Sequence, residues 1–248
     1  MALSIRQFPC LSDNYGFLIR DEASGLVATI DTPDAEAILA DLEASGWGQL
    51  NFAFNTHWHP DHAGGNERLK GETGCTLIGP QEVRRIAPLD QAVSGGDQVR
   101  LGETPFDILD VGGHTLGHVA WWSPASGVAF VGDSLFVMGC GRMFEGTPEQ
   151  FWASLQRLAA LPPETVIYCA HEYSEANARF AISVDDAPAV AARAGVIAAR
   201  RREGLATVPT TIAQELATNP FLRLPARQPE RAPEVFADVR VAKDGFKG

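Results

Sequence analysis

The sequence reads Thr-His-Trp-His-Pro-Asp-His from residue 56 to residue 62, directly after the apolar run of residues 50–55. That run is predicted as a buried β-strand, because it is short and apolar and a polar loop follows it. Three histidines and one aspartate therefore occupy six residues of a loop at the end of a strand. Clustering these groups costs solvation free energy and invites charge repulsion unless a cation compensates. The stretch predicts a metal site.

The other three histidines also follow predicted strands. His114 and His118 come after the strand predicted at residues 106–111, and His171 comes after the strand at 166–169. Asp133 has the equivalent place after residues 128–131. A lone histidine at a strand end usually makes a structural hydrogen bond. Imidazole nitrogens and carboxylate oxygens gathered on several strand-end loops are instead the ligands that divalent metals such as zinc bind.

The candidate ligands outnumber the four or five that one zinc ion takes. His57 and His59 are two residues apart in an extended segment, so their side chains share one face, while Asp61 and His62 can reach a second position. One carboxylate shared by two metals accounts for the surplus. Two metals about 3.5–4 Å apart can hold a hydroxide near neutral pH. The pattern favours a hydrolase with two metal ions.

Bulk composition narrows the class of protein. The chain has 248 residues, of which 45% are hydrophobic and 21% charged, enough for one large domain plus a small one. No apolar run approaches the roughly 20 residues of a membrane span, and no secretory apolar segment of about 7–15 residues follows the start. The four cysteines are scattered, which suits free thiols in a reducing compartment. We expect a cytoplasmic protein with no membrane partner, and a monomer rather than an oligomer.

The charge balance bears on the substrate. The formal net charge is −11, which weighs against nucleic acid as a partner. The basic residues Arg193 and 200–202 lie on an alanine-rich helical stretch and are predicted to form a solvated face. An anionic small molecule would therefore need a local basic patch elsewhere.

Strands, turns and helices alternate over the first two-thirds of the chain. Residues 17–19 and 27–30 are predicted as a hairpin, with Ser24 and Gly25 in its turn. A helix should follow, with Thr32 as N-cap, Pro33 at the first position and Gly46 at its end. Another should begin after Thr147. Further strands are predicted at residues 76–79, 98–101, 106–111, 119–123, 128–131 and 166–169, and a helix at 66–71.

Helices dominate from about residue 173 onward. They are predicted at residues 174–184, 188–203 and 211–217, and strand-like runs largely stop. We therefore expect a catalytic domain at 1–172 and a small helical domain at 173–248.

The chain resembles a known family in several segments. The His57-x-His59-x-Asp61-His62 motif is that of the metallo-β-lactamase superfamily. Within it, the chain resembles glyoxalase II (hydroxyacylglutathione hydrolase) over nearly its whole length. The segments concerned are Leu-Ser-Asp-Asn-Tyr (11–15), Gly-Asp-Ser-Leu-Phe (132–136), Gly-Cys-Gly-Arg-Met-Phe-Glu-Gly (139–146), His-Glu-Tyr (171–173), Asn-Pro-Phe (219–221) and Lys-Asp-Gly-Phe (243–246).

The resemblance implies an α+β fold, the αββα metallo-β-lactamase sandwich, with a C-terminal helical domain that binds glutathione. It also implies an assignment of ligands to two divalent ions, which we expect to be zinc, with iron or manganese as alternatives. His57, His59 and His114 would bind the first ion, and Asp61, His62 and His171 the second. Asp133 would bridge both, and His118 would be a supporting hydrogen-bonder.

The implied substrate is the thioester S-D-lactoylglutathione, hydrolysed to D-lactate and glutathione in the second step of methylglyoxal detoxification. Residues implied to contact glutathione are Arg142, Phe144, His171, Glu172, Tyr173, Arg240 and Lys243. These would supply the basic patch that an acidic protein needs for an anionic ligand. Two positions depart from the family pattern: Phe144 replaces a tyrosine, and Gly112-Gly113 replaces a turn containing proline.

The implied mechanism needs no side-chain nucleophile. A hydroxide held between the metals attacks the carbonyl, with Asp61 and Asp133 as the catalytic residues that hold it in place. A thiolate whose conjugate acid has a pKa of about 8.5 leaves without a general acid. Alternatives are another thioesterase or a lactonase on the same scaffold, a persulfide dioxygenase with a single iron, and a metal-binding module without catalysis.

Overall fold

The computed structural model describes residues 3–248 and divides into two compact units. The first unit takes in Met1–Asp110 and Gly117–Gly132, and the second takes in Val111–Leu116 and Asp133–Gly248. These units follow spatial contacts and are not the two domains predicted from the sequence. The boundary predicted at residue 172 stays a prediction.

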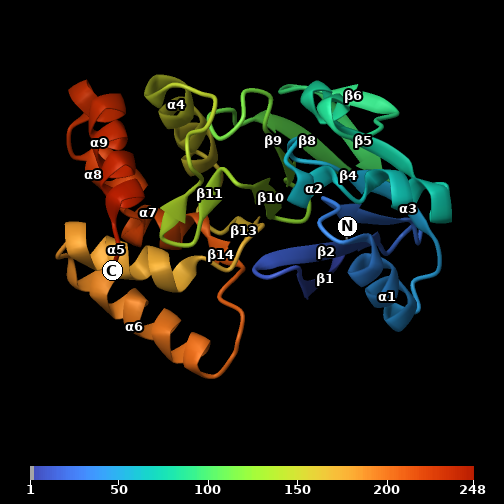
Figure 1. The fold of residues 1–248 in the computed structure, drawn as a ribbon, viewed down its shortest axis with the longest axis horizontal. Helices are drawn as coiled ribbons and strands as arrows, with labels where there is room; N and C mark the ends of the chain where they lie inside the picture. The colour runs from blue at the N-terminus through green and yellow to red at the C-terminus, as the bar shows by residue number, and fades with distance from the viewer. Residues whose placement is uncertain (1–2) are drawn as a thin grey trace. The chain divides into compact units, whose positions relative to one another are not determined.

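The first unit begins with a mixed sheet whose strand order follows the chain. Its first three strands pair antiparallel and the last four parallel (Figure 1). The predicted hairpin is confirmed, because Phe17 pairs with Ile30. The edge strand at residues 3–10 was not predicted from the sequence. It carries Arg6 and Pro9, and a proline argues against a strand unless that strand lies at a sheet edge. The strands are β1 (Leu3–Cys10), β2 (Asn14–Asp21), β3 (Val27–Ile30), β4 (Leu50–Phe54), β5 (Thr76–Pro80) and β6 (Gln91–Val93).

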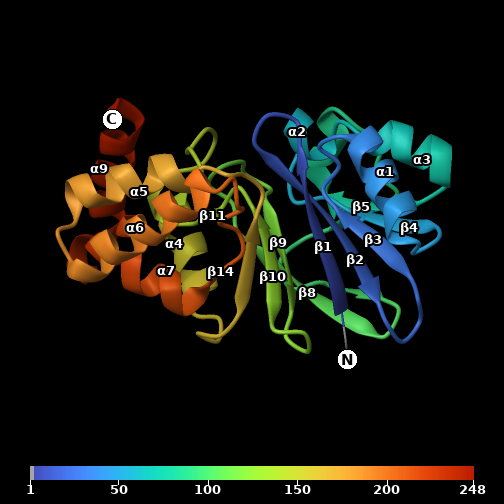
Figure 2. The same ribbon diagram turned by 90° about the horizontal axis from the view of Figure 1, so that it is seen from below.

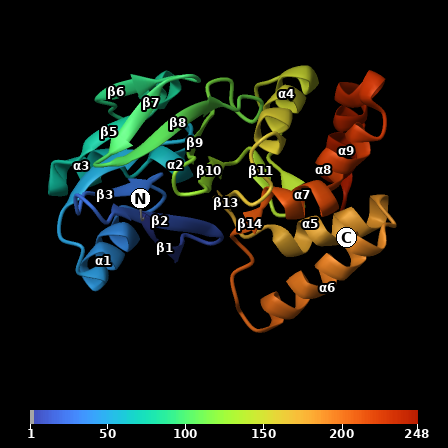
Figure 3. The same cartoon turned by 180° about the vertical axis from the view of Figure 1, so that it is seen from behind.

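Four antiparallel strands form a second layer of the same unit: β7 (Gln98–Leu101), β8 (Thr104–Asp110), β9 (Val119–Ser123) and β10 (Val128–Gly132) (Figure 3). Aromatic side chains join this layer to the first sheet. The Phe54 ring of β4 stacks on Trp121 of β9, with centroids 4.4 Å apart. Phe17 of β2 meets Phe130 of β10 edge-on at 5.6 Å. The core of this unit therefore lies between two face-to-face sheets.

Two helices, α1 (Ala35–Ser45) and α3 (Asn66–Thr73), cover the other face of the first sheet. The unit also contains the short α2 (Pro60–Ala63) and η1 (Gln81–Arg85). Ile38 of α1 and Leu69 of α3 pack in one buried cluster with Leu18, Leu50 and Leu77 of the strands. Neighbouring residues of β2 point to opposite faces, so Leu18 meets α1 while Phe17 faces the second layer.

The predicted start of α1 was wrong. The helix begins at Ala35, and Asp34 is its N-cap, with a carboxylate that accepts hydrogen bonds from the backbone N–H groups of Glu36 and Ala37. Thr32 instead donates its hydroxyl to Asn66 Oδ1 at 2.8 Å. A long-range contact therefore uses the side chain that local sequence assigned to a cap. The predicted end at Gly46 is confirmed, with the glycine at φ 66°.

The second unit is mainly helical. Its strands are short: β11 (Leu135–Phe136), β12 (Gly139–Cys140), β13 (Val166–Cys169) and β14 (Thr210–Thr211). Its helices are α4 (Pro148–Ala159), α5 (Ser174–Val184), α6 (Pro188–Arg202), α7 (Ile212–Thr218), α8 (Pro220–Ala226) and α9 (Ala232–Gly245), with η2 (Pro229–Arg231) before the last. As predicted, the Thr147 hydroxyl caps α4 by accepting from the Gln150 N–H.

Packed aromatic rings form the core of the helical unit. Phe236 of α9 meets Phe151 of α4 at 5.4 Å and Phe221 of α8 at 6.1 Å. Phe180 of α5 meets Phe221 at 5.9 Å, and α5 lies beside α6 (Figure 2). Sequence analysis missed α8 and α9, because Pro225 lies inside α8 and prolines also open both helices. Nowhere in residues 3–248 does a helix have the length and apolar content of a membrane span.

Candidate metal centre and substrate cavity

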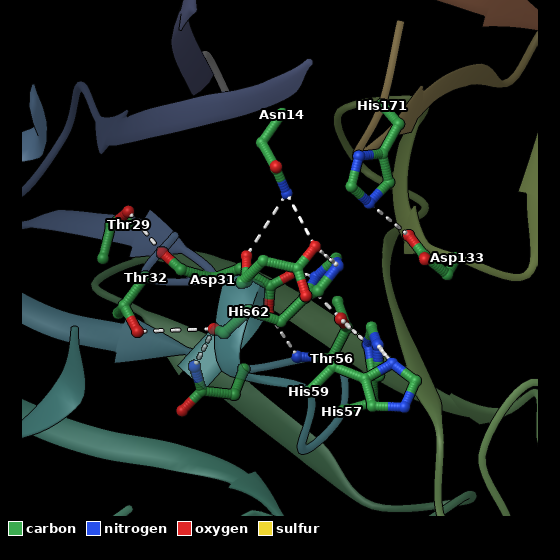
Figure 4. A network of polar contacts seen from close by, with 12 residues as sticks. Asn14, Thr29, Asp31, Thr32, Thr56, His57, His59, His62, Asp133 and His171 are labelled. Carbon is green, nitrogen blue, oxygen red and sulfur yellow. Dashed lines mark hydrogen bonds and ion pairs between the residues drawn. The ribbon is translucent and has the colours of Figure 1, made fainter. Parts of the chain in front are cut away.

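In the first unit, the loop after β4 gathers the predicted ligands. His57 Nε2 and His59 Nδ1 lie 3.0 Å apart, as expected for side chains two residues apart on one face (Figure 4). Proline at the first position of α2 starts the short helix that carries Asp61 and His62. His62 Nε2 lies 3.4 Å from Asp61 Oδ2. The structure thus brings four of the predicted ligands together.

Asp31 anchors this loop, and sequence analysis missed it. One carboxylate oxygen accepts the Thr56 N–H at 2.7 Å, and the other lies 2.8 Å from both Thr56 Oγ1 and His62 Nδ1. The residue is buried, and its φ of 56° lies in the left-handed region. The available signal was its position directly after the strand of residues 27–30, because the predicted ligands also follow strands.

Two further residues support the loop. Asn14 donates its amide to Asp61 Oδ2 at 3.1 Å and to the Asp61 carbonyl at 3.3 Å. His118 is fully buried and stacks on the His57 ring, with centroids 4.5 Å apart. The role of His118 as a supporting hydrogen-bonder stays a prediction.

In the second unit, Asp133 lies between two imidazoles. Its Oδ2 is 3.4 Å from His114 Nε2. Its Oδ1 is 3.3 Å from His171 Nε2 (Figure 4). The Tyr173 ring stacks parallel to His171 at 4.7 Å. A carboxylate with a separate imidazole on each oxygen is suited to serve two cations.

Each unit presents imidazole and carboxylate groups of the kind that bind divalent metal ions. His62 Nδ1 is hydrogen-bonded to Asp31, and His114 Nδ1 to the Arg142 carbonyl at 2.8 Å. Such partners fix the orientation of the ring and present Nε2 as a ligand. The imidazoles are neutral ligands and the carboxylates anionic, which suits zinc, iron or manganese.

The loop that carries His114 depends on glycine. Gly113 has φ 144°, and a Cβ there would lie 2.4 Å from Cγ of Phe151 in α4. The loop is held by residues 142–146, since the Phe144 N–H donates to the His114 carbonyl and the Gly146 N–H to the Gly113 carbonyl. The glycine pair at 112–113 therefore lets the loop lie directly against α4.

A cavity of about 500 Å³ lies within the second unit. Its lining combines the metal-type ligands His114 and Asp133 with cations and aromatic rings. Predicted substrate-binding residues that line it are Arg142, Phe144, Tyr173, Arg240 and Lys243. Phe144 is 60% exposed and turns its ring edge to His114 at 5.2 Å.

Lys243, one of the cations of the cavity lining, has a shifted pKa. Burial, reinforced by the positive charges of Arg240, Arg179 and Arg142, lowers its pKa to about 8. Its ammonium donates to the Ala176 carbonyl at 3.1 Å. A half-buried cation among other cations is poised to pair with an anion.

Arg240 and Glu172 are held by the protein itself. Arg240 is 4% exposed and donates Nη1 to the carbonyls of Cys140 and Gly141, and Nη2 to Asp244. The Glu172 carboxylate accepts the backbone N–H and the hydroxyl of Thr207. Neither Glu172 nor His171 is part of the cavity lining. The predicted contacts of these residues with substrate stay predictions.

Two family models together match most of the chain. Residues 28–171 match the metallo-beta-lactamase superfamily, and residues 172–246 match the hydroxyacylglutathione hydrolase C-terminus. The crystal structure of ETHE1 from Myxococcus xanthus is similar, with a TM-score of 0.71 and 28% identity over 96% of this chain and 90% of that one. The fold is therefore the α+β metallo-β-lactamase sandwich with a C-terminal helical domain, as predicted.

Curated relatives narrow the class. A hydroxyacylglutathione hydrolase of Erythrobacter litoralis is 53% identical over 98% of this chain and 100% of its own length. One of Maricaulis maris is 52% identical over 98% of this chain and 99% of its own. The chain belongs to the hydroxyacylglutathione hydrolase family of the metallo-β-lactamase superfamily.

Proposed function

We propose that the protein hydrolyses the thioester S-D-lactoylglutathione to D-lactate and glutathione, the second step of methylglyoxal detoxification. The observation that carries the proposal is the composition of the cavity. Metal-type ligands and three cations share one lining in the second unit. A thioester whose acyl group is reactive and whose thiol part is anionic needs both.

The cations have a defined task in this proposal. Glutathione carries two carboxylates, and charge-assisted hydrogen bonds from Arg142 and Lys243 would bind them. The rings of Phe144 and Tyr173 would pack on the apolar part of the tripeptide and exclude water. These contacts supply the local basic patch on a chain of net charge −11.

For the metals, we propose the assignment that the family resemblance implies. His57, His59 and His114 would hold one divalent ion, Asp61, His62 and His171 the other, and Asp133 would contact both. Ions bound there would lower the pKa of a water molecule and polarise the thioester carbonyl. Zinc is the metal that we propose.

The residues around these proposed ligands keep Asp61 and His62 oriented. Asn14 holds Asp61 through its side-chain amide, and Asp31 fixes the ring of His62. The leaving thiolate, whose conjugate acid has a pKa of about 8.5, departs without a proton donor. A side-chain general acid is therefore not required.

We also propose that the protein works in the cytoplasm as a monomer. The four cysteines, Cys10, Cys75, Cys140 and Cys169, are free and buried, which suits a reducing compartment. Sedimentation velocity would check the monomer, and a main species of twice the mass would contradict it.

One assay separates this function from its alternatives. Purified protein would be given S-D-lactoylglutathione and, separately, a short thioester without glutathione, with metal analysis of the same sample. We expect much higher kcat/KM on the glutathione thioester. Equal turnover of both would indicate a general thioesterase. If a lactone is added as a third substrate and is the only one hydrolysed, the protein is a lactonase.

A further inference from the structure

A small hairpin follows Asp133 in the chain and borders the cavity. Strands β11 and β12 have two residues each, and Val137 and Met138 form the turn between them. Phe136 and Cys140 of the hairpin line the cavity, and so do Gly141 and Arg142, which follow it. A hairpin this short is not stable by itself, so its conformation must be imposed by its surroundings.

The turn is conformationally demanding. Met138 has φ 53°, a left-handed conformation that is unfavourable for a residue other than glycine. Side chains of the C-terminal helices hold it there. The carboxylate oxygen Oε2 of Glu215 accepts the Met138 N–H at 2.9 Å. Asn219 donates its amide to the carbonyls of Gly139 and Phe136, at 2.8 and 3.2 Å.

Glu215 is itself fixed by a buried network. The residue is 0% exposed, and its Oε1 accepts from Arg193 Nη2 at 2.8 Å and Thr210 Oγ1 at 2.7 Å. Its Oε2 also accepts the Asn219 amide at 2.9 Å. A buried ion pair contributes little net stability, but breaking one partner leaves an uncompensated charge. The network is therefore better suited to specify a conformation than to stabilise the fold.

Arg240 fixes the same chain segment one step further along. Its Nη1 donates to the carbonyls of Cys140 and Gly141 at 3.0 and 3.3 Å. The segment of residues 136–141 thus has carbonyls or N–H groups bonded to Asn219, Glu215 and Arg240 in turn. Arg142 follows this segment directly and lines the cavity.

We propose that Glu215 is a positioning residue for substrate binding: through Asn219 and the β11–β12 hairpin it sets the place of Arg142 and the floor of the glutathione cavity. The inference rests on the proposed function for the identity of the substrate. It assigns to a buried acid of α7 an effect on KM, although Glu215 does not line the cavity.

The test compares Glu215→Gln with a matched control. Both carboxylate oxygens of Glu215 accept hydrogen bonds, whereas glutamine has an NH₂ group, which only donates, in place of one of them. The hydrogen bonds to that side of the group must therefore break. For S-D-lactoylglutathione we expect KM to rise about tenfold and kcat to stay within about twofold, the signature of lost uniform binding. Turnover of the short thioester without glutathione should not change.

Asp185→Asn is the control. Asp185 is another buried carboxylate of the helical unit, and it pairs with Arg223 and Arg227 of α8 and its C-cap rather than with the hairpin. Its substitution should lower the unfolding temperature and leave KM unchanged. Asn219→Ala, which removes the bonds to Phe136 and Gly139 but keeps Glu215 paired with Arg193, should reproduce the rise in KM.

Three outcomes would overturn the inference: an unchanged KM in Glu215→Gln, an equal loss on both thioesters, or the same rise in KM in Asp185→Asn. Amide exchange of Met138 gives a readout that needs no turnover. Exchange should accelerate in Glu215→Gln and in Asn219→Ala, but not in Asp185→Asn. If the wild type does not hydrolyse glutathione thioesters, the proposed function fails, while unchanged exchange at Met138 would sink the positioning role separately.

Discussion

Asp31 combines backbone strain with three hydrogen bonds at one buried carboxylate. A left-handed conformation in a non-glycine residue persists only where its surroundings impose it, and here Thr56 and His62 do so. The side chain fixes both the loop that carries His57 and the ring orientation of His62. At this position, backbone strain is coupled to the orientation of His62, a proposed metal ligand.

Asp31→Asn tests that coupling. Asparagine tolerates a positive φ, so the backbone should hold. Both oxygens of Asp31 accept hydrogen bonds, but asparagine has only one side-chain oxygen and cannot replace both. The bond that orients His62 should weaken, and metal affinity should fall about 10–100-fold. Competition with a chelator of known affinity would measure the change, with Asp185→Asn as the control. Unchanged affinity would show that His62 is oriented without Asp31.

Lys243 should give the pH profile of kcat/KM a fall on the alkaline side. Its pKa of about 8 is depressed, so the ammonium is charged below that pH and neutral above it. Binding of a carboxylate then weakens, and kcat/KM for the glutathione thioester should fall as pH rises through about 8. Lys243→Arg keeps the charge and should remove this fall. A fall that persists in Lys243→Arg would come from another group.

At the scale of elements, Asp21 joins two turns of the first unit. Fully buried at the end of β2, it accepts from Ser24 in the β2–β3 turn and from Glu103 N–H and Thr104 Oγ1 at the β7–β8 turn. Burial alone would raise the pKa of this carboxyl, but these hydrogen bonds outweigh it and lower the pKa to about 2. A single side chain thus links the two sheets at one end.

Asp21→Asn should lower the free energy of unfolding by about 2 kcal/mol at neutral pH. Since the folded pKa is depressed, this stability is present above about pH 4 and is lost as pH falls through about 2. Urea unfolding of the wild type and of Asp21→Asn, both treated with a chelator, would measure the difference at several pH values. A difference that does not shrink below pH 4 would mean that the carboxylate charge is not its source.

At the scale of the whole molecule, metal content tests the proposed ligand set. We expect purified protein, supplied with zinc, to hold two ions per chain, and Asp133→Ala to be the most damaging of the single ligand changes, because that carboxylate would serve both ions. Elemental analysis with turnover on the same sample would measure this. A firm plateau at one ion with full activity, or Asp133→Ala with two ions and most of its turnover, would contradict the assignment.

Much of this protein could be predicted from short stretches of sequence. Apolar runs of four to eight residues marked most strands, Gly46 marked the end of α1, and Thr147 with Pro148 marked the start of α4. The predicted metal ligands follow those strands, because strand ends are where loops present side chains. Such features depend on neighbours in sequence, so the chain itself determines them.

Only the tertiary structure decided which side chains support the others. Asp31 reaches His62 across 31 residues, and Thr32 is diverted from its cap to Asn66. Arg240 reaches Cys140 across 100 residues, and Glu215 reaches Met138 across 77. No local pattern encodes these pairs. A carboxylate or guanidinium is hydrated at any exposed position, and it needs a partner only when burial removes this hydration. Short stretches of sequence were therefore enough to indicate the candidate ligands and the family, whereas folding, by burying these charged groups, determined what holds the candidate ligands in place.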